Sequence, residues 1–223
     1  MNDALLELEP LQRLIAAYAR SADRDRYALL FALDARLAEV VRSTTEILIG
    51  HMRLTWWRDI LTQSAAERPA GEPLVAQINL LEKSGASLAP LVSLVDGWEV
   101  MLDDFPWEDR QFDHYATARG EGYFASGLAG DPSLSERQAE QARAWALWDF
   151  ARHCSDENMR RDAFDRCSRI MASRPKPDFD RSGRPLSILC QLMLRDVRKG
   201  QLTANLYSPA SAARIIGHGI SGR

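Results

Sequence analysis

The feature that most constrains the fold is the stretch from Ala139 to Met159, which is apolar at almost every position between Ala142 and Ala151. A helix that is apolar on every side lies buried in a protein core. Its few polar residues are informative, because an unpaired polar group in a core costs roughly 2 to 7 kcal/mol and is normally removed or given a partner. The sequence therefore predicts a buried central helix over this stretch.

Two rows of polar residues interrupt the predicted central helix. Asp149, His153 and Glu157 follow one another at i, i+4 and i+8, and Arg152 and Asp156 form a second i, i+4 pair beside them. Residues at these spacings share one face of a helix. The rows are either a seam of mutually satisfied polar groups or the wall of a functional site. The seam is the preferred interpretation, because perturbed titratable groups also occur in structural networks.

The remaining sequence shows helical periodicity, without the alternating pattern of strands. The sequence thus predicts an all-α fold, with residues 1–223 as a single domain and loops at Ser64 to Pro73 and Arg174 to Pro185. Helices are expected at about 10–20, 23–42, 43–62, 74–83, 87–104, 109–128, 139–159, 159–173 and 186–199, with a short last helix opening at Ser208-Pro209.

Two helix starts and one helix interior carry local signals. Ser43 with Glu46, and Ser135 with Gln138, have the spacing of capping boxes that satisfy free N–H groups at a helix start. Small residues in the predicted helix 109–128, namely Ala118, Gly122 and Ser126, allow close approach of either another helix or a ligand. Both explanations remain open from the sequence.

Composition narrows the classes of function. The 28 basic and 31 acidic residues give a net charge of -3 with no basic region, so nucleic acid is not the expected partner. Cys154, Cys167 and Cys190 follow no metal-binding spacing and fit reduced, buried thiols. Without a signal peptide or a run of about 18 apolar residues, the protein is expected in the cytoplasm, with peripheral contact with a membrane left open.

Four blocks of the sequence, taken in order, resemble the signatures of the squalene/phytoene synthase family. That resemblance implies the isoprenoid synthase fold, a single-domain helical bundle around a central cavity. The blocks are LFALDARLAEVVRS at Leu30 to Ser43, LVDGWEVML at Leu94 to Leu102, the segment with Tyr115, Ala118 and Gly122 to Gly130, and the segment with Asp149, Arg152, His153, Asp156 and Glu157.

The resemblance also implies a degenerate catalytic site. Active members hold Mg²⁺ and prenyl diphosphates between two Asp-rich motifs, a task for carboxylate oxygens. Here the three aspartates of the first motif are replaced by Ala38, Glu39 and Arg42. In the second motif Asp149 replaces an asparagine, and His153 and Glu157 replace aspartates, while Arg152 and Asp156 occupy its two other positions. We therefore expect no catalytic residues and no metal ligands, with Mg²⁺ needed only if prenyltransferase activity persists.

The resemblance equates further residues with the wall of the substrate cavity. These cavity residues are Asp34, Tyr115, Ala118, Gly122, Asp149 and His153. If Arg42 faces the central helix, it should pair with Glu157 or Asp149, and its positive charge would repel bound metal ions.

The stretch His51 to Leu61 (HMRLTWWRDIL) is similar to a divergent branch of the family that includes a mitochondrial complex I assembly factor. A helix here is expected to bury Ile49, Met52, Trp56 and Ile60. Arg53, Trp57 and Arg58 would then form an interface at the edge of the core, since Trp and Arg are enriched in binding hot spots. Burial of both tryptophan rings is the alternative.

The sequence thus favours a squalene/phytoene synthase-like protein that has lost Mg²⁺-dependent condensation and acts as a binding or assembly factor for a protein partner. The alternatives are a prenyltransferase that condenses prenyl diphosphates, and a non-catalytic carrier of an apolar isoprenoid or other lipid. Fold alone does not separate these three functions.

Overall fold

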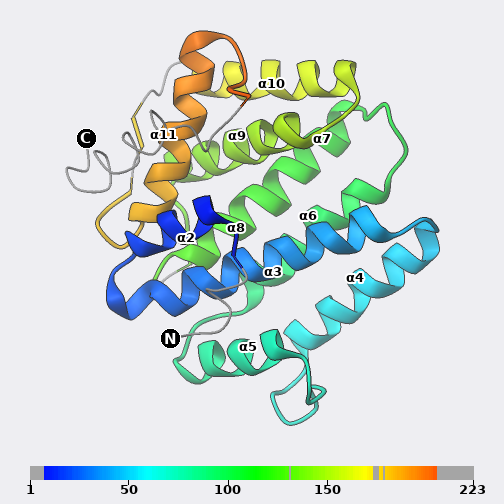
Figure 1. Ribbon diagram of the computed structural model, residues 1–223, viewed down its shortest axis with the longest axis vertical. Coiled ribbons are helices and arrows are strands. Elements are labelled where there is room, and N and C mark those ends of the chain that lie inside the picture. The colour runs from blue at the N-terminus through cyan, green and yellow to red at the C-terminus, as the bar shows by residue number, and fades with distance from the viewer. Residues whose placement is uncertain (1–7, 131, 173–175, 178, 205–223) are drawn as a thin grey trace.

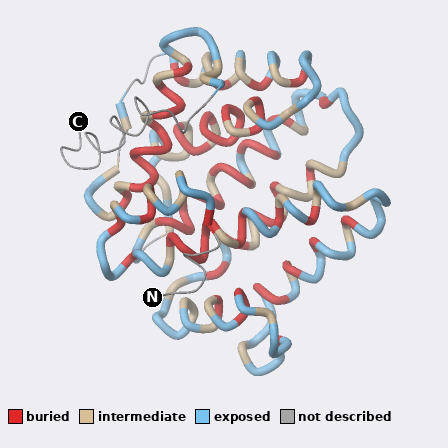
Figure 2. The backbone as a smooth tube through the Cα atoms, viewed as in Figure 1, coloured by how far each residue is buried: buried red, intermediate tan, exposed pale blue. Residues whose placement is uncertain are grey.

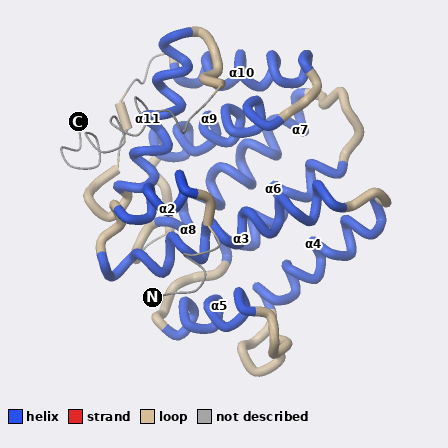
Figure 3. Tube along the Cα trace, viewed as in Figure 1, coloured by secondary structure: helices blue, strands red, loops and turns tan. Residues whose placement is uncertain are grey.

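The computed structural model describes residues 8–130, 132–172, 176–177 and 179–204, which contain helices and loops and no strand (Figure 3). The all-α prediction is confirmed. The elements are α2 (Pro10–Ala17), η1 (Ser21–Asp23), α3 (Arg24–Ser43), α4 (Ile47–Thr62), α5 (Pro73–Lys83), α6 (Ala89–Glu99), η2 (Val100–Leu102), α7 (Asp109–Tyr115), the π-helical segment η3 (Ala116–Glu121), α8 (Gly122–Gly127), α9 (Glu136–His153), α10 (Glu157–Met171) and α11 (Arg184–Lys199).

Helix α9 is the central element, as the sequence predicts. It begins with the predicted capping box, in which Ser135 accepts a hydrogen bond from the backbone N–H of Gln138 at 3.3 Å. Trp145 and Trp148, which share one face of α9, and Phe150 on another face are all buried. The helix packs against α10, α11 and η3, and buried positions run along its length in Figure 2. The surrounding helices thus cover α9 on several sides.

The prediction of one continuous helix over 139–159 is wrong, because α9 ends at His153 and α10 begins at Glu157. Asp156 has an extended backbone, and its carboxylate accepts a hydrogen bond from the backbone N–H of Met159 at 2.9 Å. This side-chain bond satisfies a free N–H at the start of α10 and competes with continuation of α9. The predicted ladder is therefore broken between His153 and Glu157, whereas the i, i+4 pair remains, with His153 Nδ1 at 3.6 Å from Oδ1 of Asp149.

The capping box predicted at Ser43 is also wrong, since Ser43 is the last residue of α3 and Glu46 precedes α4. The Ser43 hydroxyl instead accepts a hydrogen bond from Arg53 Nη1 at 3.0 Å. Helix α4 then runs along the edge of the molecule opposite α10 (Figure 1). This position leaves one side of α4 exposed.

The predicted helix 109–128 is present as α7, η3 and α8 in succession. Its glycines mark contacts between helices: a Cβ on Gly120 would lie 2.4 Å from the carbonyl oxygen of Ala142, and a Cβ on Gly122 would lie 2.7 Å from that of Pro90. Helix contact therefore explains both glycines without a ligand.

Two further expectations concern the ends of the chain and membranes. The short helix predicted at Ser208-Pro209 lies outside the described residues. Within the described ranges, none of the helices has the length and apolar character needed to cross a bilayer.

Candidate functional site

The buried interior contains an ion triad of Asp34, Arg119 and Asp149. Asp34 lies on α3, Arg119 on η3 and Asp149 on α9. Nη2 of Arg119 is 3.0 Å from Oδ2 of Asp34 and 2.8 Å from Oδ2 of Asp149, and the Arg119 side chain is 2% exposed. One guanidinium thus joins two helices that are far apart in the sequence.

Aromatic rings enclose the guanidinium of Arg119. Its Cζ lies 4.7 Å from the ring centre of Trp98 and 4.9 Å from that of Trp145, with Tyr115 and Tyr123 at 5.8 and 6.0 Å. A cation over an aromatic face is attracted by the ring quadrupole. These side chains fill the space between Asp34 and Asp149.

The local backbone explains how a large charged residue reaches this interior. A π-helical turn carries an extra residue relative to an α-helix and often marks a special site, and Arg119 lies within such a turn. Gly97 on α6 has its Cα against the backbone of Arg119, where a Cβ would lie 2.4 Å from the Arg119 nitrogen. Gly97 and Gly120 therefore let η3 pack closely between α6 and α9.

Burial and charge act in opposite directions on the triad. Burial raises the pKa of Asp34 above its ordinary value, although Arg119 and the Trp98 N–H, which donates to Asp34 Oδ1 at 2.7 Å, lower it in part. Burial would lower the pKa of Arg119, but Asp34, Tyr115 and Asp149 raise it overall. Arg119 therefore remains a permanent cation.

The three degenerate positions of the first motif do not reach the triad, although Asp34 of the same block does. Ala38 is half-buried, while Glu39 and Arg42 are exposed and pair with each other at 2.7 Å. The predicted pairing of Arg42 with Glu157 or Asp149 is wrong, because Arg42 lies in the last turn of α3, where its side chain reaches solvent.

The second degenerate motif contributes only Asp149. Arg152 donates to the backbone oxygen of Thr203 at 2.7 Å and lies over the Trp148 ring. The His153 side chain is 73% exposed and lies beside Asp149 on the solvent side, Asp156 caps α10, and the Glu157 side chain is 80% exposed.

The predicted cavity residues divide between two places. Asp34, Tyr115 and Asp149 meet around Arg119. Ala118 and Gly122 instead line an open groove of about 480 Å³ between α6, η3 and the loop at residues 132–134. His153 lies at the exposed edge of the triad, with Nδ1 at 3.6 Å from Oδ1 of Asp149.

The burial predicted for α4 is confirmed for Ile60, which is 1% exposed, and is wrong at four other positions. Trp57 is buried at 3% exposure, whereas Trp56, Met52 and Ile49 are exposed. Leu54, Trp57 and Leu61, at i, i+3 and i+7, form the buried face of α4. Apolar residues lie on both sides of this helix, so the pattern alone does not identify the inner face.

The two arginines of the predicted interface differ. Arg53 is exposed, as expected. Arg58 turns toward α6, where it donates to Asp96 at 2.7 Å and pairs with Glu99. Glu99 also pairs with His51 at 2.8 Å. Arg58 is thus engaged within the chain.

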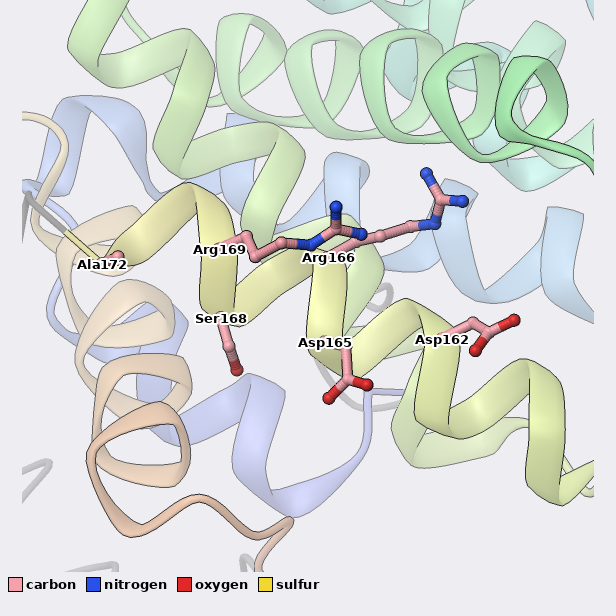
Figure 4. A pocket seen from close by; sticks show the side chains of 6 residues that line it. All are labelled: Asp162, Asp165, Arg166, Ser168, Arg169 and Ala172. Atoms are coloured by element: carbon pink, nitrogen blue, oxygen red, sulfur yellow. The ribbon is translucent and has the colours of Figure 1, made fainter.

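Another hollow, of about 660 Å³, follows the outer side of α10 (Figure 4). Arg166 and Arg169 extend to one side of the helix there, while Asp165 and Ser168 point to the other (Figure 4). Arg166 pairs with Asp109. The hollow gathers no convergent set of polar groups.

Sequence reasoning missed Arg119, the centre of the ion triad. The available signal was a charged residue beside Gly120 in a helix with several small residues.

Comparison of the sequence with protein-family models gives no match, and comparison with curated proteins finds no similar protein.

Proposed function

We propose that this chain is a non-catalytic squalene/phytoene synthase-like protein that has exchanged condensation of prenyl diphosphates for a role as a binding or assembly factor. The observation that carries the proposal is the salt-bridged position of Arg119 between Asp34 and Asp149. The resemblance to the family implies that Asp34 and Asp149 belong to the two segments that would hold metal ions on opposite sides of a cavity. A side-chain cation now joins them.

The residues around the triad do not fit Mg²⁺. This ion requires octahedral oxygen ligands at about 2.0 to 2.1 Å, and the nearest carboxylate oxygens already bind a guanidinium. The buried atoms here without a hydrogen-bond partner among the described residues are N–H groups, Nε and Nη1 of Arg119 and Nε1 of Trp145. These groups donate hydrogen bonds and cannot ligate a cation.

A turnover assay tests the loss of condensation. The purified chain, incubated with farnesyl or geranylgeranyl diphosphate and Mg²⁺, should release no more pyrophosphate than buffer alone. Robust Mg²⁺-dependent release would overturn the proposal and favour the prenyltransferase alternative.

The carrier alternative rests on the groove lined by Ala118 and Gly122. Mass spectrometry of an organic extract distinguishes it from a protein-binding factor. A stoichiometric isoprenoid in wild type that is lost from an Ala118→Trp variant would favour the carrier. Extracts without lipid, together with a stoichiometric protein partner that survives purification from the source cells, would support the binding factor.

A further inference from the structure

Helix α4 carries an unusual concentration of exposed apolar residues. Of the seven large hydrophobic residues that are exposed in the described parts of the chain, five belong to this helix. Four of them, Leu48, Ile49, Met52 and Trp56, follow a helical spacing and form what we call the α4 stripe. Leu48 is 71% exposed and Met52 is 64% exposed. Large contiguous apolar patches on soluble proteins usually mark interaction sites.

The stripe lies on an accessible side of the molecule. Helix α4 packs its opposite face, with Leu54 and Trp57, against α6 and the core. The helix itself runs along an edge of the molecule, with exposed segments along its outer side (Figures 1 and 2). A partner could therefore approach α4 without disturbing the core.

One flank of the stripe carries two opposite charges. Glu46, the N-cap residue just before α4, and Arg53 are both exposed and seven residues apart, a spacing of about two helical turns. Arg53 donates to the hydroxyls of Ser43 and Thr44 at 3.0 and 3.3 Å. Within the described ranges, neither Glu46 nor Arg53 forms an ion pair.

The basic side chains on the other flank are already paired with acidic residues of the same chain. His51 and Arg58 pair with Glu99, and Arg58 also pairs with Asp96. The charges that remain for a partner are therefore Glu46 and Arg53 on the first flank, and the exposed Asp59 near the end of α4.

We propose that the α4 stripe is the interface of a homodimer in which the α4 helices of two copies pack antiparallel. A twofold axis near position 50 brings together Leu48, Ile49 and Met52 of both copies. The same axis places the Arg53 of each copy opposite the Glu46 of the other. An interface between identical copies must be self-complementary in this way.

The charge pattern argues against the other occupants. Anionic lipid is attracted by clusters of basic residues, whereas this flank has one acid and one base. A different protein could cover the apolar residues, but it would need its own matching charges. A second copy supplies the matching charges by symmetry. The proposed dimer does not depend on the proposed function.

Sedimentation velocity on the full chain tests the dimer. Wild type should be a dimer that dissociates on dilution, and Met52→Asp should be monomeric at the same concentration. Leu80→Asp is the matched control, because Leu80 is 66% exposed on α5 and outside the stripe. This control should dimerise like wild type, and circular dichroism should show the same helix content for all three proteins.

A charge exchange tests the antiparallel arrangement. Glu46→Arg and Arg53→Glu should each weaken the dimer about 10-fold or more, since each places like charges opposite one another. The double variant Glu46→Arg with Arg53→Glu restores both pairs and should return the dissociation constant to within about threefold of wild type.

Three results would overturn the proposal. These are a wild-type monomer at about 100 µM in low salt, a dimer that survives Met52→Asp, and a double variant no tighter than the single ones. Binding of the stripe to anionic vesicles by a protein that stays monomeric would identify a lipid surface instead.

Discussion

Arg119 is the residue whose removal should change stability most, because two carboxylates depend on it for charge compensation. Arg119→Met should lower the free energy of unfolding by about 3 to 5 kcal/mol, the usual cost of leaving a buried charge unpaired. Urea denaturation followed by circular dichroism measures this loss. Adding Asp34→Asn should recover part of it, since one of the two uncompensated charges is then removed.

Arg42→Ala is the matched control for that experiment. Among the described residues, Arg42 pairs only with Glu39 on the surface of the same helix, and the two side chains are 71% and 55% exposed. Exposed ion pairs contribute about 0 to 1 kcal/mol, so this variant should unfold close to wild type. Equal losses for Arg42→Ala and Arg119→Met would contradict the burial of the triad.

At the scale of elements, the close packing of η3 against α6 depends on Gly97. A Cβ at this position would lie within 2.4 to 2.6 Å of Arg119, including its backbone nitrogen and Cα. Because backbone atoms cannot rotate away, Gly97→Ala should cost about 2 to 3 kcal/mol, in the upper range for overpacked cores. Thermal and urea unfolding both measure this cost.

Gly50→Ala provides the comparison on α4. There the added Cβ meets the end of the Leu102 side chain at 2.9 and 3.0 Å, which can change rotamer. Replacing a glycine inside a helix by alanine also stabilises the helix by about 0.5 to 1 kcal/mol. Gly50→Ala should therefore stay within about 1 kcal/mol of wild type, and a loss as large as that of Gly97→Ala would show that the Leu102 side chain cannot yield.

The contact between α4 and α6 should depend on pH through Glu99. Burial would raise the pKa of Glu99, but hydrogen bonds from His51 and Arg58 hold it below its ordinary value. A carboxylate with a lowered folded-state pKa stabilises the fold above its unfolded pKa, about 4.3 for glutamate, and this stability is lost as pH falls through the folded pKa. Between about pH 5 and pH 3, wild type should therefore lose more stability than Glu99→Gln.

The quantity to measure is the difference in free energy of unfolding between wild type and Glu99→Gln at each pH. The difference is needed because other carboxylates also titrate in this range. A constant difference from about pH 5 to pH 3 would contradict the role of the pairs with His51 and Arg58.

At the scale of the whole molecule, the three cysteines report how the core opens. Cys167 and Cys190 are buried in α10 and α11, whereas Cys154 is partly exposed between α9 and α10. Burial raises the pKa of all three thiols, so all should react slowly. A thiol reagent should modify one cysteine per native chain and all three in denaturant, and rapid native modification of three would contradict the packing of α10 against α11.

Most helices could be predicted from the sequence, including the buried α9 with its cap at Ser135, because periodicity and capping are local properties. Two boundaries were wrong, at Ser43 and at residues 154–156. In both cases a side chain had two competing uses, and the choice depended on neighbouring segments. Asp156 caps α10, for example, instead of extending the row of polar residues on α9.

The candidate site was predictable only in part. Asp34, Tyr115 and Asp149 were singled out from the sequence and do meet in the interior, but the sequence placed Arg42 beside them, where the structure has Arg119. Spacing indicates which residues share a helix face, whereas the meeting of α3, η3 and α9 depends on packing between helices distant in the chain.

The sequence by itself determined the all-α class and the burial of α9, because a helix with no polar side must be covered by other helices. Only the tertiary structure decided which face of α4 is buried, since Trp56 and Trp57 are equally apolar and the packing against α6 selects Trp57. It also decided that a guanidinium compensates the buried carboxylates. Gly97 and Gly120 allow η3 to approach α6 and α9 closely, and the Arg119 side chain then reaches both carboxylates.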